Sequence, residues 1–158
     1  MSTEHRRSWL SWKAEKRCLQ AVVAVACLVP ILGGGRGMIY GLDTMEGANG
    51  ITWLSLDSHY RYLSGILLAI GLAFAATIPR IEAHGPRVRL LAALVVVGGI
   101  GRLAALLVAG NPSASVLGAL AMELLVTPLL ALWQAHLAKG SATQQDTGAT
   151  PRPPPELD

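Results

Sequence analysis

The sequence has few charged residues and few aromatic ones. Only 15% of its 158 residues are Asp, Glu, Lys or Arg, 5% are aromatic, and 52% are hydrophobic. The mean hydropathy is +0.45. This composition excludes a disordered chain, which needs high charge and low hydrophobicity, and it disfavours an ordinary soluble domain. We therefore expect a short apolar chain that forms one domain.

The residue patterns of disulfide, metal and nucleotide sites are also missing. Cys18 and Cys27 would lie about 13 Å apart on one helix, which is too far for a disulfide. The four histidines are scattered, without metal-ligand spacing and without a Ser-His-Asp arrangement. The glycines of segment 95–104 imitate a dinucleotide-binding turn, but the apolar flanks and a central arginine contradict a nucleotide fold. We expect no metal and no cofactor.

A nucleic-acid partner is equally unexpected. The net charge is +3 and the pI is about 9.2. However, the Lys and Arg residues stand beside apolar runs and form no basic face with interleaved aromatic residues. Their positions are those of topology signals, and the expected partner is a lipid bilayer.

Four apolar stretches are long enough to cross a bilayer. They are almost free of charge and cover residues 18–35, 60–79, 88–109 and 114–137. About 18 helical residues span about 27 Å, close to the hydrocarbon thickness of about 30 Å. Pro30 is expected to kink or end the first helix, and the polar segment 36–57 to be an exposed loop, alone or with a short interfacial helix.

The pattern predicts an all-α integral membrane four-helix bundle. A secretory signal peptide is the alternative for the first stretch, because a basic start before an apolar core is also its signature. The uncharged run is longer than a usual signal core, and no clear small-x-small cleavage site follows it. We therefore interpret the first stretch as a membrane span, which gives four spans in total.

The distribution of basic residues predicts the orientation. Five Lys or Arg residues precede the first span, three lie between the second and third, and two follow the fourth. The opposite side carries Arg36 alone. The positive-inside rule therefore places both termini in the cytoplasm. Residues 1–17 form a basic cytoplasmic segment, and the Pro-rich residues 139–158 are expected to be a disordered cytoplasmic tail.

Two ionisable residues interrupt the spans and are functional candidates by their position. Arg102 and Glu123 lie about 10 and 13 Å below the same outer surface, so they can pair directly. Asp57 and Arg61 are four residues apart and can share a helix face. We predict one outer-half cluster, as a ligand-binding or helix-pairing site: Asp57, His59, Tyr60, Arg61, Arg102 and Glu123.

Three roles are open for this cluster. It can hold the helices in register, line a ligand pocket at the outer mouth, or belong to a proton or ion pathway. Thr127, one turn deeper than Glu123, and Gln134 are expected on the same helix face as Glu123. A proton relay needs titratable groups that continue towards the cytoplasm, and beyond these two residues only His136 follows. Small residues every four positions, beginning at Gly65 and at Gly101, predict close helix contacts.

The charged and glycine-containing motifs resemble a known family. Asp57–Gly65 (DSHYRYLSG), Ile78–Glu82 (IPRIE) and Gly98–Arg102 (GGIGR), with Glu123 before Pro128, are similar to small bacterial four-helix membrane proteins known only as domain of unknown function 4345. The likeness runs from about residue 19 to residue 134. It implies a compact four-span protein of the bacterial inner membrane and brings no activity, cofactor or substrate. On architecture alone the chain is also similar to other small four-helix families of bacterial membranes, some of them associated with quinone-linked systems.

These features favour a non-catalytic multi-pass protein of the bacterial inner membrane. We expect it to bind a lipid or quinone-like amphipathic molecule, with Arg61 or Arg102 facing the polar head and Tyr60 and His59 supplying hydrogen bonds. One alternative is a small dimeric transporter, although an acid beside an arginine partner is a weaker proton-coupling site. The other is a membrane-embedded enzyme such as an isomerase, with acid and base drawn from His59, Asp57 and Glu123.

Overall fold

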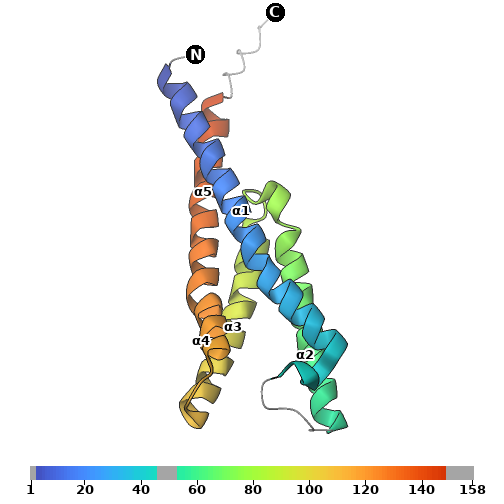
Figure 1. Cartoon of the computed structure of the whole chain (residues 1–158). Coiled ribbons are helices and arrows are strands. Elements are labelled where there is room, and N and C mark those ends of the chain that lie inside the picture. Colours follow the sequence, from blue (N-terminus) through green and yellow to red (C-terminus); the bar gives the residue numbers. More distant parts are fainter. Residues whose placement is uncertain (1–2, 46–52, 149–158) are drawn as a thin grey trace, which may run out of the picture.

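The computed structural model describes residues 3–45 and 53–148, and these ranges are all-helical apart from short turns. The elements are α1 (Thr3–Tyr40), the 3-10 turn η1 (Gly41–Thr44), α2 (Leu54–Ala75), the 3-10 turn η2 (Ile78–Arg80), α3 (Gly85–Ala109), α4 (Ala114–Ala121), the π-helical turn η3 (Met122–Val126) and α5 (Thr127–Gly148). The last three follow one another without a break. They form one rod, so the fold has four long helical rods (Figure 1).

All four rods have the length and composition of membrane spans. Within the described ranges, the candidate segments are Leu10–Thr44, Leu54–Arg80, Gly85–Ala109 and Ala114–Gly140. Many large apolar side chains are exposed along them, for example Val108 at 89%. A soluble protein rarely exposes so much continuous apolar surface. The predictions of an all-α chain and of four apolar helices are confirmed.

The first helix is longer than predicted. α1 extends past both ends of the predicted span 18–35, and it continues through Pro30. Its last turns lie close against α2, because Gly34 and Gly37 have no side chain and a Cβ atom at either position would collide with α2. The helix stops before Gly41, whose φ of +62° is the left-handed conformation typical of helix ends.

The loop and tail predictions need correction. The expected exposed loop 36–57 contains the end of α1, η1 and the first turn of α2, and its residues 46–52 lie outside the described ranges. In the predicted tail 139–158, the helix continues to Gly148, and residues 149–158 lie outside the description. The segment up to Gly148 contains no proline, so the preceding helix can propagate into it.

The rods are arranged as two pairs. α1 packs along α2, and α3 packs along the α4–η3–α5 rod (Figure 1). The pairs meet near the start of α1 and the end of α5, which we call the terminal end, and diverge towards the opposite end, which we call the far end (Figure 1). The buried core lies where the pairs meet and consists of Leu19, Val23, Cys27, Ile81 and Leu137.

Glycines set the closest approaches within each pair. A Cβ atom at Gly34 would lie 2.6 Å from the backbone nitrogen of Leu68, so α1 and α2 are in backbone contact there. A Cβ atom at Gly99 would lie 2.9 Å from the Cβ atom of Glu123. The predicted contact at Gly101 is wrong, because Gly101 is exposed and a Cβ atom there would meet nothing within 4 Å. Gly99, two positions earlier, faces the neighbouring rod instead.

Candidate functional site

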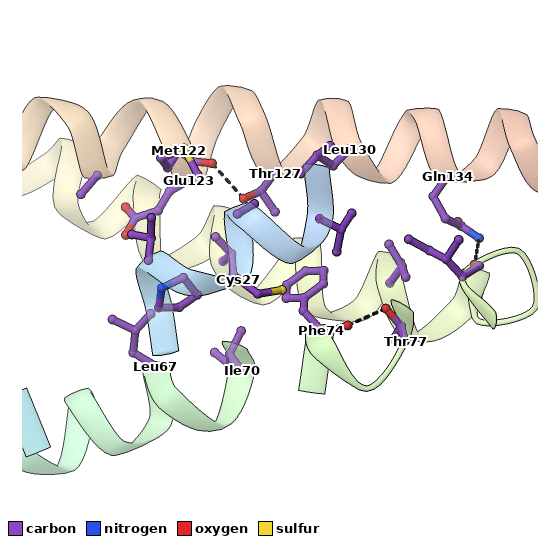
Figure 2. Close-up of a pocket in the computed structure, with 18 of the residues that line it drawn as sticks. Cys27, Leu67, Ile70, Phe74, Thr77, Met122, Glu123, Thr127, Leu130 and Gln134 are labelled. Atoms are coloured by element: carbon purple, nitrogen blue, oxygen red, sulfur yellow. Dashed lines mark hydrogen bonds between the residues drawn. The ribbon is translucent and has the colours of Figure 1, made fainter. Parts of the chain in front are cut away.

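A cavity of about 150 Å³ lies between the two helix pairs. All four rods contribute to its wall, which is mainly aliphatic and aromatic. Figure 2 shows Cys27 from α1, Ile70 and Phe74 from α2, and Leu130 from α5 around the same space. The sequence analysis placed a pocket at the outer mouth and missed this interior cavity, because helix rotation and the angle between the pairs are not encoded in any one segment.

The Arg102–Glu123 ion pair borders the cavity. Arg102 Nε lies 2.9 Å from Glu123 Oε2, and Arg102 Nη2 lies 3.0 Å from Glu123 Oε1. The pair is therefore bidentate, which is the strongest geometry for an arginine and a carboxylate. Gly99 lies one turn before Arg102 on α3 and lets the side chains of Glu123 and Leu124 come close. The predicted direct pair is confirmed.

The fourth rod places a line of polar side chains on the cavity wall. Glu123, Thr127 and Gln134 all line the cavity, as their predicted common face requires (Figure 2). Thr127 donates its hydroxyl proton to the Met122 carbonyl at 2.8 Å. Gln134 is fully buried and donates from Nε2 to the Ile81 carbonyl at 2.8 Å, which connects α5 to the turn before α3.

A π-helical turn at Met122–Val126 carries Glu123. The Thr127 N–H bonds to the carbonyl of Met122, five residues earlier, instead of four. Pro128 explains this wider turn, because it has no N–H and its ring would press on the carbonyl of Leu124 in a regular α-helix. Such turns occur frequently at functional sites. The sequence analysis missed it, and the proline just after Glu123 was the available signal.

The Asp57–Arg61 pair is the second charged pair and lies at the far end of the first helix pair. Arg61 Nε donates to Asp57 Oδ2 at 2.6 Å, and the Leu42 N–H donates to Asp57 Oδ1 at 2.9 Å. Arg61 Nη1 donates to the carbonyls of Met38 and Ile39. These contacts satisfy carbonyls at the end of α1 that have no partner within the helix. The pair therefore fastens the end of α1 to α2.

The two aromatic candidates near this pair also make local contacts. The hydroxyl of Tyr60 lies 3.1 Å from Oγ1 of Thr44. His59 is exposed, and its Nδ1 lies 3.1 Å from the Ser55 carbonyl of the same helix. Neither side chain lines the cavity.

The structure thus divides the six predicted site residues between two places. Arg102 and Glu123 border the cavity, whereas the other four lie at the far end of the first helix pair: Asp57, Tyr60 and Arg61 contact α1 or η1, and His59 contacts a carbonyl of its own helix. Among the residues described here, no hydrogen bond or ion pair joins the two groups. They are separate because the helix pairs diverge towards the far end (Figure 1).

The chemistry offered by the cavity is hydrogen bonding and ion pairing in an apolar setting. Over the described ranges, no three His, Cys, Asp or Glu side chains gather in a metal-ligand arrangement. Cys18 and Cys27 are both free thiols. Cys27 lies on the cavity wall and Cys18 is exposed.

Comparison with known proteins identifies a family. A family model described as a domain of unknown function (DUF4345) matches residues 18–134. The matched range contains every residue of the cavity wall and both charged pairs. No curated protein and no solved structure matches the chain.

Proposed function

We propose that this chain, which belongs to the family described as a domain of unknown function (DUF4345), is a multi-pass membrane protein that binds an amphipathic molecule between its helix pairs. The observation that carries the proposal is the cavity with Arg102 and Glu123 at its border. A largely apolar wall with a few placed polar groups is the usual composition of a small-molecule site. An ion pair inside a membrane span is a functional candidate by default.

The proposed setting is the bacterial inner membrane, with the terminal end in the cytoplasm. The start of α1, the η2–α3 turn and the end of the fourth span carry nearly all basic residues outside the spans. The positive-inside rule assigns such regions to the cytoplasmic side. In this orientation the Arg102–Glu123 pair lies in the outer half of the bilayer.

Arg102 is the proposed contact for the polar head. It uses Nε and Nη2 for Glu123, and Nη1 has no hydrogen-bond partner within residues 3–45 and 53–148. Nη1 can therefore donate to an acceptor oxygen on a ligand. Because Glu123 neutralises the guanidinium, the site favours a neutral or zwitterionic head, such as that of a lipid or a quinone-like compound, over a strong anion.

Arg61, Tyr60 and His59 have no part in this proposal. The sequence analysis predicted that these side chains contact the polar head of the ligand, but they do not line the cavity. Arg61 contacts the end of α1 and Tyr60 contacts η1, which gives both a structural role, and His59 contacts a carbonyl of its own helix.

The ligand is proposed to enter from the side of the protein. Val29 and Leu67 line the cavity, yet they are 56% and 37% exposed on the outer surface. The cavity therefore reaches the surface that faces lipid in a membrane. An apolar molecule dissolved in the bilayer can then enter without crossing water.

A cavity-filling substitution tests the proposal. We expect wild-type protein, purified in mild detergent, to retain a specific amphipathic molecule in native mass spectrometry. Ala119→Phe adds a ring at the cavity wall and should lose this molecule. Ala105→Phe, at an exposed position on α3 outside the cavity, is the matched control and should keep it. Equal retention by all three proteins, or no specific molecule in the wild type, would contradict the proposal.

A further inference from the structure

The buried end of the cavity contains a hydrogen-bond acceptor without a partner. Gln134 is fully buried, and its Oε1 accepts no hydrogen bond from any described residue. The amide orientation is determined chemically, because the Ile81 carbonyl can only accept and must face the NH2 group at 2.8 Å. Oε1 is therefore the atom left over. Buried polar atoms are almost always paired, so this exception needs an explanation.

The hydroxyl groups that line the cavity do not supply the missing proton. Thr77 and Thr127 line the same cavity, but each hydroxyl proton is donated to a carbonyl of its own helix, Phe74 at 2.7 Å and Met122 at 2.8 Å. The Nη1 group of Arg102 lies at the other end of the cavity. About 16 Å of helix separates Glu123, its partner, from Gln134, at about 1.5 Å per residue.

The amide lies at a point where the backbone of α3 leaves space. A Cβ atom at Gly85, the first residue of α3, would lie 3.6 Å from Oε1 and 3.5 Å from Nε2 of Gln134. The guanidinium of Arg89 borders this position, with Nη1 3.9 Å from the same Cβ atom, and makes no described hydrogen bond to Oε1. The Gln134 amide is held by Ile81 on one side, and its Oε1 has no described donor.

We infer that the cavity selects an amphipathic molecule whose buried end carries a hydroxyl group, which donates a hydrogen bond to Gln134 Oε1. The inference rests on the proposed function and narrows its ligand class. The ligand has an acceptor oxygen in its polar head, which faces Arg102, and a hydroxyl group at the opposite end of its apolar body. A plain alkyl end, or a ring that bears only carbonyl groups, leaves Gln134 unpaired and binds more weakly.

Three neutral esters of equal chain length test this selectivity on the wild-type protein. Methyl 12-hydroxydodecanoate offers a terminal donor, methyl 12-methoxydodecanoate offers only an acceptor there, and methyl dodecanoate offers neither. Binding to delipidated protein in detergent is measured by native mass spectrometry and by the rise in melting temperature. We expect the hydroxy ester to bind about tenfold more tightly than the other two.

The outcomes separate this inference from the proposed function. If the three esters bind within about twofold of one another, the inference is overturned while the proposed function stands; this is also the result expected if water occupies the site beside Gln134. If no ester binds and the protein holds no amphipathic molecule, both are overturned.

A substitution at Gln134 tests whether its buried amide causes the selectivity. Gln134→Met has a similar length and no acceptor oxygen, so it should bind the hydroxy and plain esters equally. Leu130→Met, on the same cavity wall, is the matched control and should keep the tenfold preference. A preference that survives in a folded Gln134→Met protein would overturn the assignment to Gln134. If that variant does not fold, the wild-type ester series alone decides the question.

Discussion

The two ends of the molecule are held together in different ways. At the terminal end, polar side chains connect the two helix pairs: Lys16 Nζ lies 2.7 Å from Glu82 Oε1, and Trp133 Nε1 lies 3.0 Å from Glu15 Oε1. Within the first pair, Gln20 on α1 donates to the Ile78 carbonyl in the turn after α2 at 2.7 Å. At the far end, both ion pairs act inside a helix pair, and no described polar contact crosses between the pairs.

This difference explains why the cavity has its shape and position. Interhelical hydrogen bonds and close apolar packing can fix the two pairs relative to each other at the terminal end. Within the described residues, the far end has no such connection, and the helix pairs diverge towards it (Figure 1). The comparison predicts that changes at the terminal end affect the whole fold, whereas changes at the far end act on one helix pair.

The largest expected effect is on the core of the terminal end. Leu137 is 1% exposed, and Leu137→Ala should lower the free energy of unfolding by about 3 kcal/mol, because it leaves a cavity in packed surroundings. Leu107 on α3 is 78% exposed, and Leu107→Ala should cost less than about 0.5 kcal/mol. Thermal unfolding in detergent measures both. Equal losses would show that the terminal end is not the stabilising core.

A slightly smaller effect is expected within the first helix pair. Gly34→Ala places a Cβ atom 2.6 Å from a backbone nitrogen of α2, so the helices must separate, at a cost of about 2 kcal/mol. Gly33 has nothing within 4 Å of a new Cβ atom, and Gly33→Ala should be neutral or stabilising. Melting temperatures of the two variants provide the comparison. A stable Gly34→Ala protein would disprove the close contact between α1 and α2.

The Arg102–Glu123 pair should contribute less to stability than these packing contacts. Glu123→Leu leaves Arg102 without its partner and should destabilise the fold by about 1.5 kcal/mol. The double variant Arg102→Met with Glu123→Leu should recover more than half of this loss, because no unpaired charge remains. A double-mutant cycle of unfolding free energies measures the coupling. Additive losses would mean that the two side chains do not interact.

The smallest effect is expected at His59. It is exposed and contacts only a carbonyl of its own helix, so His59→Ala should change the free energy of unfolding by less than about 0.5 kcal/mol. Retention of the co-purifying amphipathic molecule should also be unchanged. Loss of that molecule in a folded His59→Ala protein would place His59 back in the binding site.

Local sequence signals account for much of the architecture. Long uncharged runs predict the rods because a bilayer-length helix requires them, and the pairing of Arg102 with Glu123 follows from their equal depth on consecutive antiparallel spans. Helix ends were predicted less well. Pro30 and the three glycines at 33–35 are usual helix breakers, but packing of α1 against α2 overrides them.

The cavity and its buried acceptor could not be derived in the same way. Both depend on the angle between two helix pairs and on the rotation of each rod, which no single segment determines. The expected single cluster failed for this reason: equal depth in the membrane placed Arg61 and Arg102 at one level, but not side by side. Gln134 was noticed as part of a polar face, while its unpaired oxygen is visible only in the packed structure.

The π-helical turn also determines the rotational phase of the fourth rod. An α-helix advances by about 100° per residue, so the residue count of Met122–Val126 decides the direction of every later side chain on that rod. A regular α-helix through the same residues would turn α5 by about 100° from its present phase and carry Gln134 away from the cavity. The wider turn at Met122–Val126, independently of its side chains, thus decides which face of α5 is turned inward.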